Sequence, residues 1–358
     1  MIFTEFRFLA FFAVVLAVHW ALPRNRPRKV WLLLASYAFY AAWDWRFLSL
    51  ILGSTVLDYF VGRRLDGAAL SEGARKRWVS LSVIGNLGIL SAFKYFHFFA
   101  DSALALLEAL GFHADPLTIR IILPVGISFY TFQTMSYSLD VYRRKMRATH
   151  DILDLALFVG FFPQLVAGPI VRAREFIPQL ARRRARSDVR FRPYLLLFLA
   201  GFFKKACVSD NIVGVVDRYF ADPASYDALS TWIAVLLYTI QIYCDFSGYS
   251  DIAIATAGFL GYTLCENFAF PYFSGSIQDL WRRWHISLSS WLRDYLYIPL
   301  GGSRGGKLFR YRNLMLTMLL GGLWHGAAWT FVIWGAIHGA LLVGQRAMSG
   351  AGISLEGI

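Results

Sequence analysis

Residues Trp281–Gly302 read WRRWHISLSSWLRDYLYIPLGG, and residues Gly322–Gly326 read GLWHG. The longer stretch sets charged residues and His285 among tryptophans and tyrosines, and the shorter one sets His325 inside a hydrophobic run. Because ionisable groups are expensive to keep in a bilayer, each one in a membrane protein is a candidate for function. Two histidines framed by aromatic residues favour acid–base or transfer chemistry at a membrane.

The composition is that of a membrane protein. Of the 358 residues, 57% are hydrophobic and only 16% are charged, whereas a soluble domain is about 45–50% apolar and about 25% charged. Apolar runs long enough to cross about 30 Å of hydrocarbon recur from end to end. The basic residues that give the net charge of +13 lie between these apolar runs. This placement indicates cytoplasmic loops and attraction to anionic membrane lipids, and not nucleic-acid binding. The sequence predicts an all-α, polytopic membrane protein.

Cysteine spacing and the N-terminal stretch exclude two other classes. Cys207, Cys244 and Cys265 lie in or beside apolar runs without ligand-like spacing, so we expect no disulfide framework and no zinc site. We also expect no other metal and no bound cofactor. Residues 1–22 lack a basic n-region and an A-x-A-like cleavage site, so we expect a retained first span and not a cleaved signal peptide.

Basic clusters between the apolar runs set the expected topology. Arg24–Lys29 follows the first span, which places the N-terminus outside and this loop in the cytoplasm. Val30–Val61 is long enough for two crossings, joined at the outer interface by an aromatic turn at Trp43-Asp44-Trp45. Further crossings are predicted over Trp78–Ala100, Ile119–Tyr142, Pro193–Tyr219, Thr231–Leu264 and Asn313–Gln345, the last split in two near Gly326. Loops expected outside carry Asp101, Glu108, Asp115, Asp222 and Asp227.

The segment Ile152–Ile170 conflicts with a simple crossing. It is apolar, but Arg172–Arg192 after it is the most basic segment of the chain, and one crossing would place that cluster outside. Pro163, Gly168 and Pro169 break helices, and irregular backbone at membrane depth survives only where protein or a water-filled cavity covers it. We expect a re-entrant, broken segment that enters and leaves on the cytoplasmic side; the alternative is a kinked ordinary span.

Trp281–Leu296 has the pattern of an amphipathic helix at the membrane interface. One stripe holds Trp281, Trp284, His285, Leu288, Trp291, Leu292, Tyr295 and Leu296, and most polar residues fall opposite. The simplest interpretation is an interfacial anchor, but His285 lies within the apolar stripe. A loop rich in glycine follows, kept positive by Arg304, Lys307, Arg310 and Arg312. Arg304 and Lys307 are the candidates there to hold an anionic donor such as a phosphopantetheine thioester.

His325 is the main catalytic candidate. Gly321, Gly322 and Gly326 beside it allow a close helix approach or a local break, and Trp324 and Trp329 supply walls. An imidazole taken out of water favours its neutral form, which is the form that a general base needs. The alternative is a histidine that donates one hydrogen bond between helices.

The other polar candidates are weaker. We expect His338 to serve in packing, and we assign no role to His19, His97, His113 or His150. In YCDFSGYSD, Asp245 and Asp251 are six residues apart and face different directions on a straight helix. They either stabilise helix contacts or, Asp245 above all, line a substrate cavity.

Four ordered motifs resemble the membrane-bound O-acyltransferase family. They are WRRWHISLSSWLRDYLYIPLGG, GGLWHGAAWTFVIWG at Gly321–Gly335, FPQLVAGPI at Phe162–Ile170 and DFSGYSDIAI at Asp245–Ile254. The resemblance covers nearly the whole chain and is greatest to the branch that contains the bacterial alginate O-acetylation membrane proteins. It implies one domain over residues 1–358, a ring of tilted helices around a central tunnel. Relatives usually continue through further C-terminal helices, so the chain is either a shortened member or incomplete.

The resemblance also implies an activity. His325 matches the family's catalytic histidine and His285 its second histidine. Members of this branch take an acyl group from a cytoplasmic thioester, acetyl-CoA or an acyl-carrier protein, and deliver it outward across the inner membrane. A periplasmic partner with a hydrolase-like fold then completes transfer to a polysaccharide such as alginate. The alternatives are D-alanyl transfer, acylation of a lipid hydroxyl, and transport, which the lack of an internal repeat disfavours.

Overall fold

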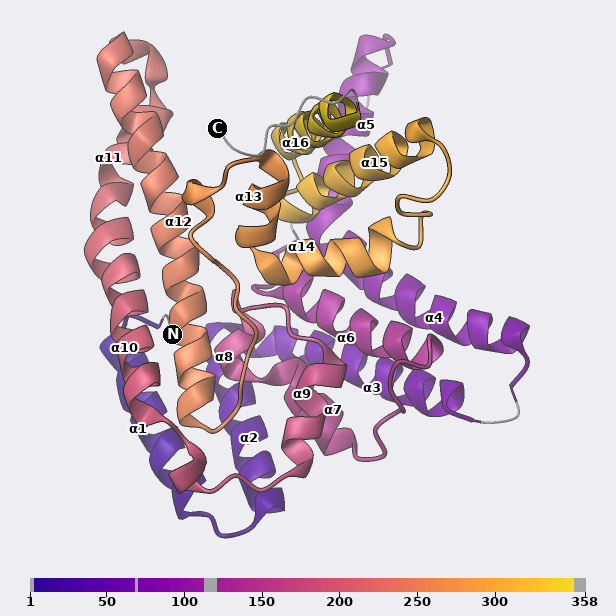
Figure 1. The fold of residues 1–358 in the computed structure, drawn as a ribbon, viewed down its shortest axis with the longest axis vertical. Helices are drawn as coiled ribbons and strands as arrows, with labels where there is room; N and C mark the ends of the chain where they lie inside the picture. Colours follow the sequence, from indigo (N-terminus) through magenta and orange to yellow (C-terminus); the bar gives the residue numbers. More distant parts are fainter. Residues whose placement is uncertain (1–2, 68–69, 113–120, 351–358) are drawn as a thin grey trace. The chain divides into compact units, whose positions relative to one another are not determined.

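The computed structural model describes residues 3–67, 70–112 and 121–350 (Figure 1). All regular secondary structure in these residues is helical. Within the described residues, three helical stretches are long and apolar enough to cross a membrane: Glu72–Ala109, Ala228–Phe259 and Trp329–Gly350. The predicted all-α membrane protein is confirmed. The ring of helices and the tunnel stay predictions.

The chain forms two compact units. The first comprises Met1–Ile51 and Asp151–Phe268, and the second comprises Leu52–His150 and Ala269–Ile358. Helices of the first unit are α1 (Phe6–Ala21), α2 (Asn25–Asp44), α7 (Ile152–Gly160), α8 (Phe162–Leu165), α9 (Ala173–Ala181), α10 (Phe191–Phe202), α11 (Asp210–Ala221) and α12 (Ala228–Phe259). Helices of the second are α3 (Leu48–Leu65, whose first turn belongs to the first unit), α4 (Glu72–Leu90), α5 (Phe96–Ala109), α6 (Ile127–Tyr142), α13 (Ile277–Arg283), α14 (Ile286–Leu292), α15 (Lys307–His325) and α16 (Trp329–Gly350).

In the first unit, α12 packs along α10 and α11 (Figure 1). Glycines make the closest approach possible, because a Cβ at Gly201 of α10 would lie 2.7 Å from the carbonyl oxygen of Gly248 of α12. Small residues allow this kind of contact between membrane helices. A π-helical stretch, Phe203–Ser209, joins α10 to α11, so the predicted crossing over Pro193–Tyr219 is helical throughout.

The segment Ile152–Ile170 is broken, as predicted. Helix α7 has nine residues, or about 14 Å at 1.5 Å per residue, too short to cross about 30 Å of hydrocarbon. Helix α7 ends at Gly160, the single turn α8 follows, and irregular backbone continues to Arg172. Phe161 and Phe162 are fully buried, so protein covers the irregular backbone. The side on which the segment enters and leaves stays a prediction.

Two predicted boundaries were wrong. Asp101 and Glu108 lie within α5 and not in a loop, because a π-helical stretch at Ser91–Tyr95 continues α4 into α5. The crossing expected from Ile119 begins as a helix only at Ile127, after irregular backbone at residues 121–126. Asp115 and His113 lie outside the described residues.

The predicted turn between α2 and α3 is confirmed. Asp44 ends α2 and accepts a hydrogen bond from the backbone N–H of Arg46, at 3.0 Å. The Arg46 guanidinium, 2.6 Å away, holds the pKa of the half-buried Asp44 carboxyl below its usual range. The ion pair compensates both charges at the turn between two apolar helices.

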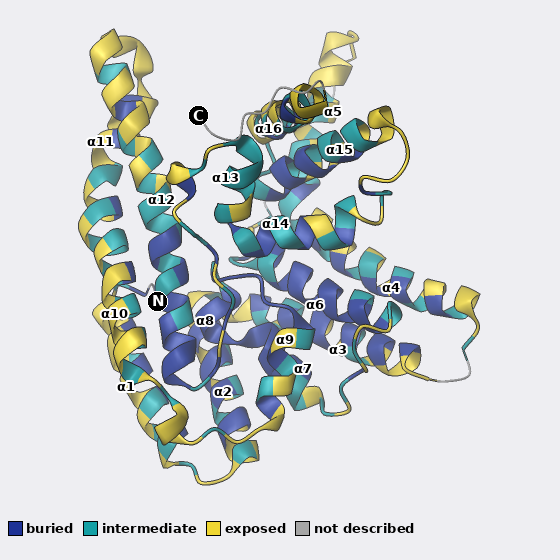
Figure 2. Ribbon diagram, in the orientation of Figure 1, coloured by how far each residue is buried: buried dark blue, intermediate teal, exposed yellow. Residues whose placement is uncertain are grey.

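A buried polar network joins α3, α4 and α6 in the second unit. The carboxylate of Asp58 on α3 accepts hydrogen bonds from Ser82 and Asn86 of α4 and from Ser138 of α6, the last two at 2.7 and 2.5 Å. All four residues are almost completely buried, and α6 is buried along nearly its whole length (Figure 2). Hydrogen bonds between membrane helices satisfy polar groups that lipid cannot.

Helices α15 and α16 lie side by side (Figure 1) and meet at glycines. A Cβ at Gly322 would clash with the carbonyl oxygen of Phe331, and one at Gly335 would clash with that of Met318. The predicted split near Gly326 is confirmed, and it places His325 at the last position of α15.

Single-cysteine labelling tests the predicted topology. In a variant without Cys207, Cys244 and Cys265, cysteines at the exposed positions 26, 77, 145 and 183 should react only with thiol reagents on the cytoplasmic side. A cysteine at position 222 should react from outside, as should positions near residue 115. Labelling at position 183 from outside would show that residues 152–170 cross the membrane fully.

Removing the Asp58 carboxylate should destabilise the second unit. Asp58→Leu leaves three buried donors without an acceptor, and each such donor costs about 1–3 kcal/mol. We expect a clear fall in the thermal unfolding midpoint in detergent. Asp66→Leu makes the same chemical change at an exposed position just beyond α3 and should leave the midpoint nearly unchanged. Equal midpoints for the two variants would contradict a stabilising network.

Candidate active site

The chain around His285 forms two short helices, and the single interfacial helix predicted over Trp281–Leu296 is wrong. Helix α13 ends at Arg283, whose carbonyl oxygen accepts a hydrogen bond from the backbone N–H of Ala269, at 3.0 Å. Trp284 is extended, and His285 adopts a left-handed conformation with φ 45° before α14 begins. Periodicity suggested one helix because apolar residues recur at similar spacing on both sides of the break.

The conformation of His285 is itself informative. A left-handed conformation costs a non-glycine residue about 1–2 kcal/mol, and residues held this way cluster at functional sites. The His285 ring is 1% exposed. It lies among Phe129 of α6, Trp324 of α15 and His325, with ring centroids 6.4, 5.9 and 6.4 Å away. The backbone reversal thus aims a buried imidazole at the end of α15.

His325 occupies the C-terminal end of α15, where the backbone becomes extended at Gly326. The Phe331 ring packs against Gly326 so closely that a Cβ there would require the ring to move. The half-buried His325 ring packs edge-on against Trp324 and Trp334, with centroids 5.2 and 5.0 Å away. Two histidines 40 residues apart in sequence are therefore neighbours within one unit.

His338 extends the same aromatic cluster. Its ring lies 4.5 Å from Trp334 of α16 and 5.3 Å from Trp281 of α13. Trp334 separates it from His325. The packing role expected for His338 stays a prediction.

Lys94 was missed by the sequence analysis. Its ammonium donates a 2.9 Å hydrogen bond to Ser128 Oγ and a second to the backbone carbonyl of Trp324, the residue before His325. The signal was available, because Lys94 is the one Lys, Arg, Asp or Glu in the predicted crossing Trp78–Ala100. The predicted topology relies on clusters of basic residues between apolar runs, and such clusters do not reveal a single basic residue inside a run.

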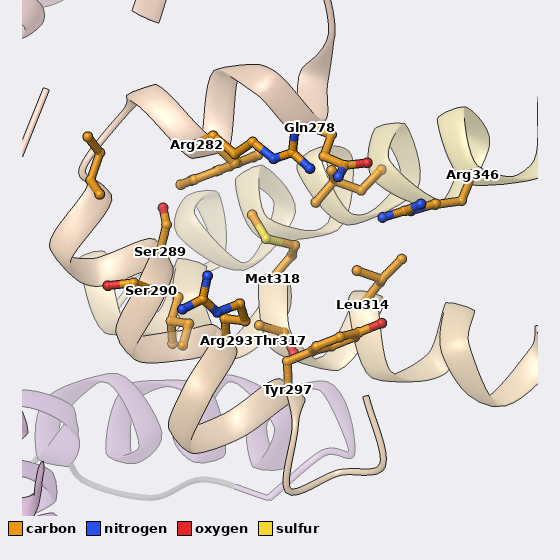
Figure 3. A pocket seen from close by; sticks show the side chains of 14 residues that line it. Gln278, Arg282, Ser289, Ser290, Arg293, Tyr297, Leu314, Thr317, Met318 and Arg346 are labelled. Carbon is orange, nitrogen blue, oxygen red and sulfur yellow. The ribbon is translucent and has the colours of Figure 1, made fainter. Parts of the chain in front are cut away.

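A cavity of about 380 Å³ lies in the same unit, lined by residues of α13, α14, α15 and α16 that include Ile286, the residue after His285. Arg282 of α13, Arg293 of the π-helical stretch Arg293–Tyr297 and Arg346 of α16 line three sides of it, around Met318 (Figure 3). Arg293 donates to Asp294 at 2.7 Å, and no carboxylate from the described residues lines the cavity. Trp281 borders both this cavity and His338. Beside the paired Arg293, the cavity offers Arg282, Arg346 and apolar walls to an anionic ligand.

The remaining predicted site residues are dispersed. Trp324 is buried and touches both His285 and His325. Arg304 and Lys307 are exposed; Lys307, Arg310 and Arg312 belong to α15, so the predicted loop is shorter than expected, ending at Gly306. Asp245 belongs to the first unit, where it pairs with Lys205 at 2.6 Å, while Asp251 pairs with Lys204 at 2.5 Å. No three His, Cys, Asp or Glu side chains in the described residues cluster as metal ligands.

The chain is similar to curated proteins over nearly its whole length. It is 46% identical over 350 residues to a probable alginate O-acetylase AlgI of Pseudomonas aeruginosa, a match that covers 97% of this chain and 66% of the relative. It is 41% identical to the peptidoglycan O-acetyltransferase of Helicobacter pylori, over 90% of this chain and 65% of that one. A teichoic acid D-alanyltransferase of Bacillus subtilis is 29% identical, over 61% of this chain and 58% of its own length.

The family assignment rests on these matches and on a family model. The chain spans about two thirds of the length of the alginate O-acetylases that it matches. The model of the membrane-bound O-acyltransferase family matches residues 142–351, which include both histidines. The chain belongs to the membrane-bound O-acyltransferase family.

Proposed function

We propose that this protein is a multi-pass O-acyltransferase of the inner membrane that moves an acetyl group for O-acetylation of an extracytoplasmic polysaccharide such as alginate. The names of its relatives support the acyl group and the acceptor class. The observation that carries the proposal is the pairing of His285 and His325, 6.4 Å apart between ring centroids, inside an aromatic cluster of a membrane protein. The donor is a cytoplasmic thioester, acetyl-CoA, and a periplasmic hydrolase-fold partner completes transfer to the polymer.

His325 would carry the proton through the transfer. His325 takes the proton of the attacking hydroxyl while the hydroxyl oxygen forms a bond to the thioester carbonyl carbon. The electron pair of the carbonyl double bond moves onto the carbonyl oxygen. When the carbonyl re-forms, the carbon–sulfur bond breaks, and the departing thiolate takes the proton back from His325. His285 orients the substrate or donor against this imidazole. Burial favours the neutral ring that the first step requires.

Substitution of His325 tests the catalytic assignment. His325→Ala should lower acetyl transfer by about 10²–10⁴-fold, the usual contribution of a positioned general base. His325→Gln keeps hydrogen-bonding capacity but cannot take up the proton, so it should fail almost as badly. The measurement is acetyl transfer from labelled acetyl-CoA in membranes that contain equal amounts of each variant.

Two further variants calibrate this result. His285→Ala should impair transfer less than His325→Ala if its role is orientation, and His338→Ala should change it little. Near-normal transfer by His325→Gln would mean that His325 only bridges helices, and the catalytic role would be abandoned.

One experiment compares two basic sites that we propose for binding of the thioester donor. Shielded contacts between a cation and a phosphate are worth about 1.5–3 kcal/mol each, and about 1.4 kcal/mol is a factor of ten. Arg282→Gln with Arg346→Gln removes two cations that line the cavity, where a bound ligand would shield their contacts, and should raise the KM for acetyl-CoA about tenfold or more. Arg304→Ala with Lys307→Ala should raise it less, because neither residue lines the cavity and contacts at the open surface are screened by solvent. An unchanged donor KM in both double variants would remove the donor role from both sites.

D-alanyl transfer is the second candidate, because the teichoic acid D-alanyltransferases match over part of the chain. It differs in donor, since an acyl-carrier protein then delivers the thioester. Transfer from acetyl-CoA without any carrier protein favours acetylation, and a strict need for a carrier protein favours the alternative.

A further inference from the structure

Lys94 is a cation inside an apolar helix. It lies in the π-helical stretch Ser91–Tyr95, in the middle of the 38-residue helical stretch Glu72–Ala109 that is apolar enough to cross a membrane. A charged side chain at membrane depth is costly, and such residues mark functional sites unless they are paired. Single π-helical turns within α-helices are also frequent at functional sites.

The surroundings of Lys94 hold the ammonium without neutralising it. Its two hydrogen bonds go to a hydroxyl and a carbonyl oxygen, those of Ser128 and Trp324. The rings of Tyr95 and Trp324 lie 5.8 and 5.6 Å from Nζ, and aromatic faces attract a cation. No carboxylate in the described residues pairs with it. An ammonium has three donors, so one N–H remains beyond these two bonds.

The Lys94 ammonium lies next to the chain segment that carries the catalytic candidate, His325. The carbonyl that Lys94 holds belongs to Trp324, the residue before His325, and the Trp324 ring packs against both histidines. Tyr95 donates to the neighbouring carbonyl of Leu323 at 2.8 Å. The two side chains together satisfy carbonyls that the end of α15 leaves without helical partners. The Tyr95 hydroxyl shows that a neutral donor is enough to satisfy such a carbonyl. The presence of a cation at the preceding residue, Lys94, therefore needs another explanation.

We propose that Lys94 supplies the positive charge that stabilises the oxyanion formed on the thioester carbonyl when the hydroxyl attacks. The proposal rests on the acyl transfer proposed above. In that step the carbonyl electron pair moves to oxygen, and the spare N–H and charge of Lys94 would meet it within reach of the His325 imidazole. A fixed donor aimed at developing charge acts in the transition state and not on bound substrate, so it changes kcat and not KM.

Four variants separate charge from structure. Lys94→Gln keeps N–H donors but removes the charge, Lys94→Met keeps only the length, and Lys94→Arg keeps the charge. Tyr95→Phe removes the neighbouring hydrogen bond to α15 and leaves the charge in place. Each would be purified with its full chain, placed in liposomes with the periplasmic partner, and assayed with labelled acetyl-CoA and the polysaccharide. Thermal unfolding of each variant identifies loss of fold.

The expected result is a loss of kcat without a change in donor KM. Lys94→Gln and Lys94→Met should lower kcat by about 10²–10³-fold, the usual effect of removing one oxyanion donor. Lys94→Arg should recover at least about a tenth of the wild-type kcat, and Tyr95→Phe should lose only a few-fold. Loss of kcat in Lys94→Gln with a wild-type unfolding midpoint supports the proposal.

Two results would overturn it. A near-normal kcat in Lys94→Gln, or an equal loss in Tyr95→Phe and Lys94→Gln, would make Lys94 a structural clamp on α15 and leave the acyltransferase function standing. Absence of transfer by the wild-type protein from every thioester donor would refute the proposed function and, with it, the role of Lys94.

Discussion

The end of helix α15 must be satisfied without water, and much of the second unit follows from that requirement. A helix leaves its last carbonyls without hydrogen-bond partners, and at membrane depth no water is available to donate hydrogen bonds to them. Here the Tyr95 hydroxyl and the Lys94 ammonium reach the carbonyls of Leu323 and Trp324. These bonds join the π-helical stretch between α4 and α5 to the residue before His325. The position of the histidine is therefore fixed by a different part of the chain.

Close glycine contacts and a buried polar network likewise hold helices of this unit together without water. Gly322 and Gly335 let α15 and α16 approach so closely that any side chain would clash. Asp58 gathers donors from α4 and α6 where lipid would offer none. Dispersion contacts and internal hydrogen bonds thus replace the hydrophobic driving force that soluble helices have.

The sequence predicted the features that depend on composition along the chain. Hydropathy located the long helices, Pro163 and Gly168 marked the broken segment, and Gly326 marked the end of α15. It failed at His285, because an apolar stripe continues across the backbone reversal. The hydrogen bond from Ala269 to the Arg283 carbonyl, which accompanies the reversal, joins residues that the local pattern does not connect. It also failed at Lys94, whose importance lies in a contact 230 residues away along the chain. The grouping of Arg282, Arg293 and Arg346 around one cavity likewise arises only from folding.

The π-helical stretches of the described residues, Ser91–Tyr95, Phe203–Ser209 and Arg293–Tyr297, affect how the chain tolerates a change in length. A π-turn closes its hydrogen bond over one residue more than an α-turn, so it uses one extra residue for about the same rotation. Deleting one residue there would restore an α-turn and leave later side chains on nearly the same face. Deleting one residue in a flanking α-helix would instead rotate every later side chain by about 100° relative to the earlier ones. Each π-helical stretch is thus the place in its helix where the loss of one residue changes the later faces least.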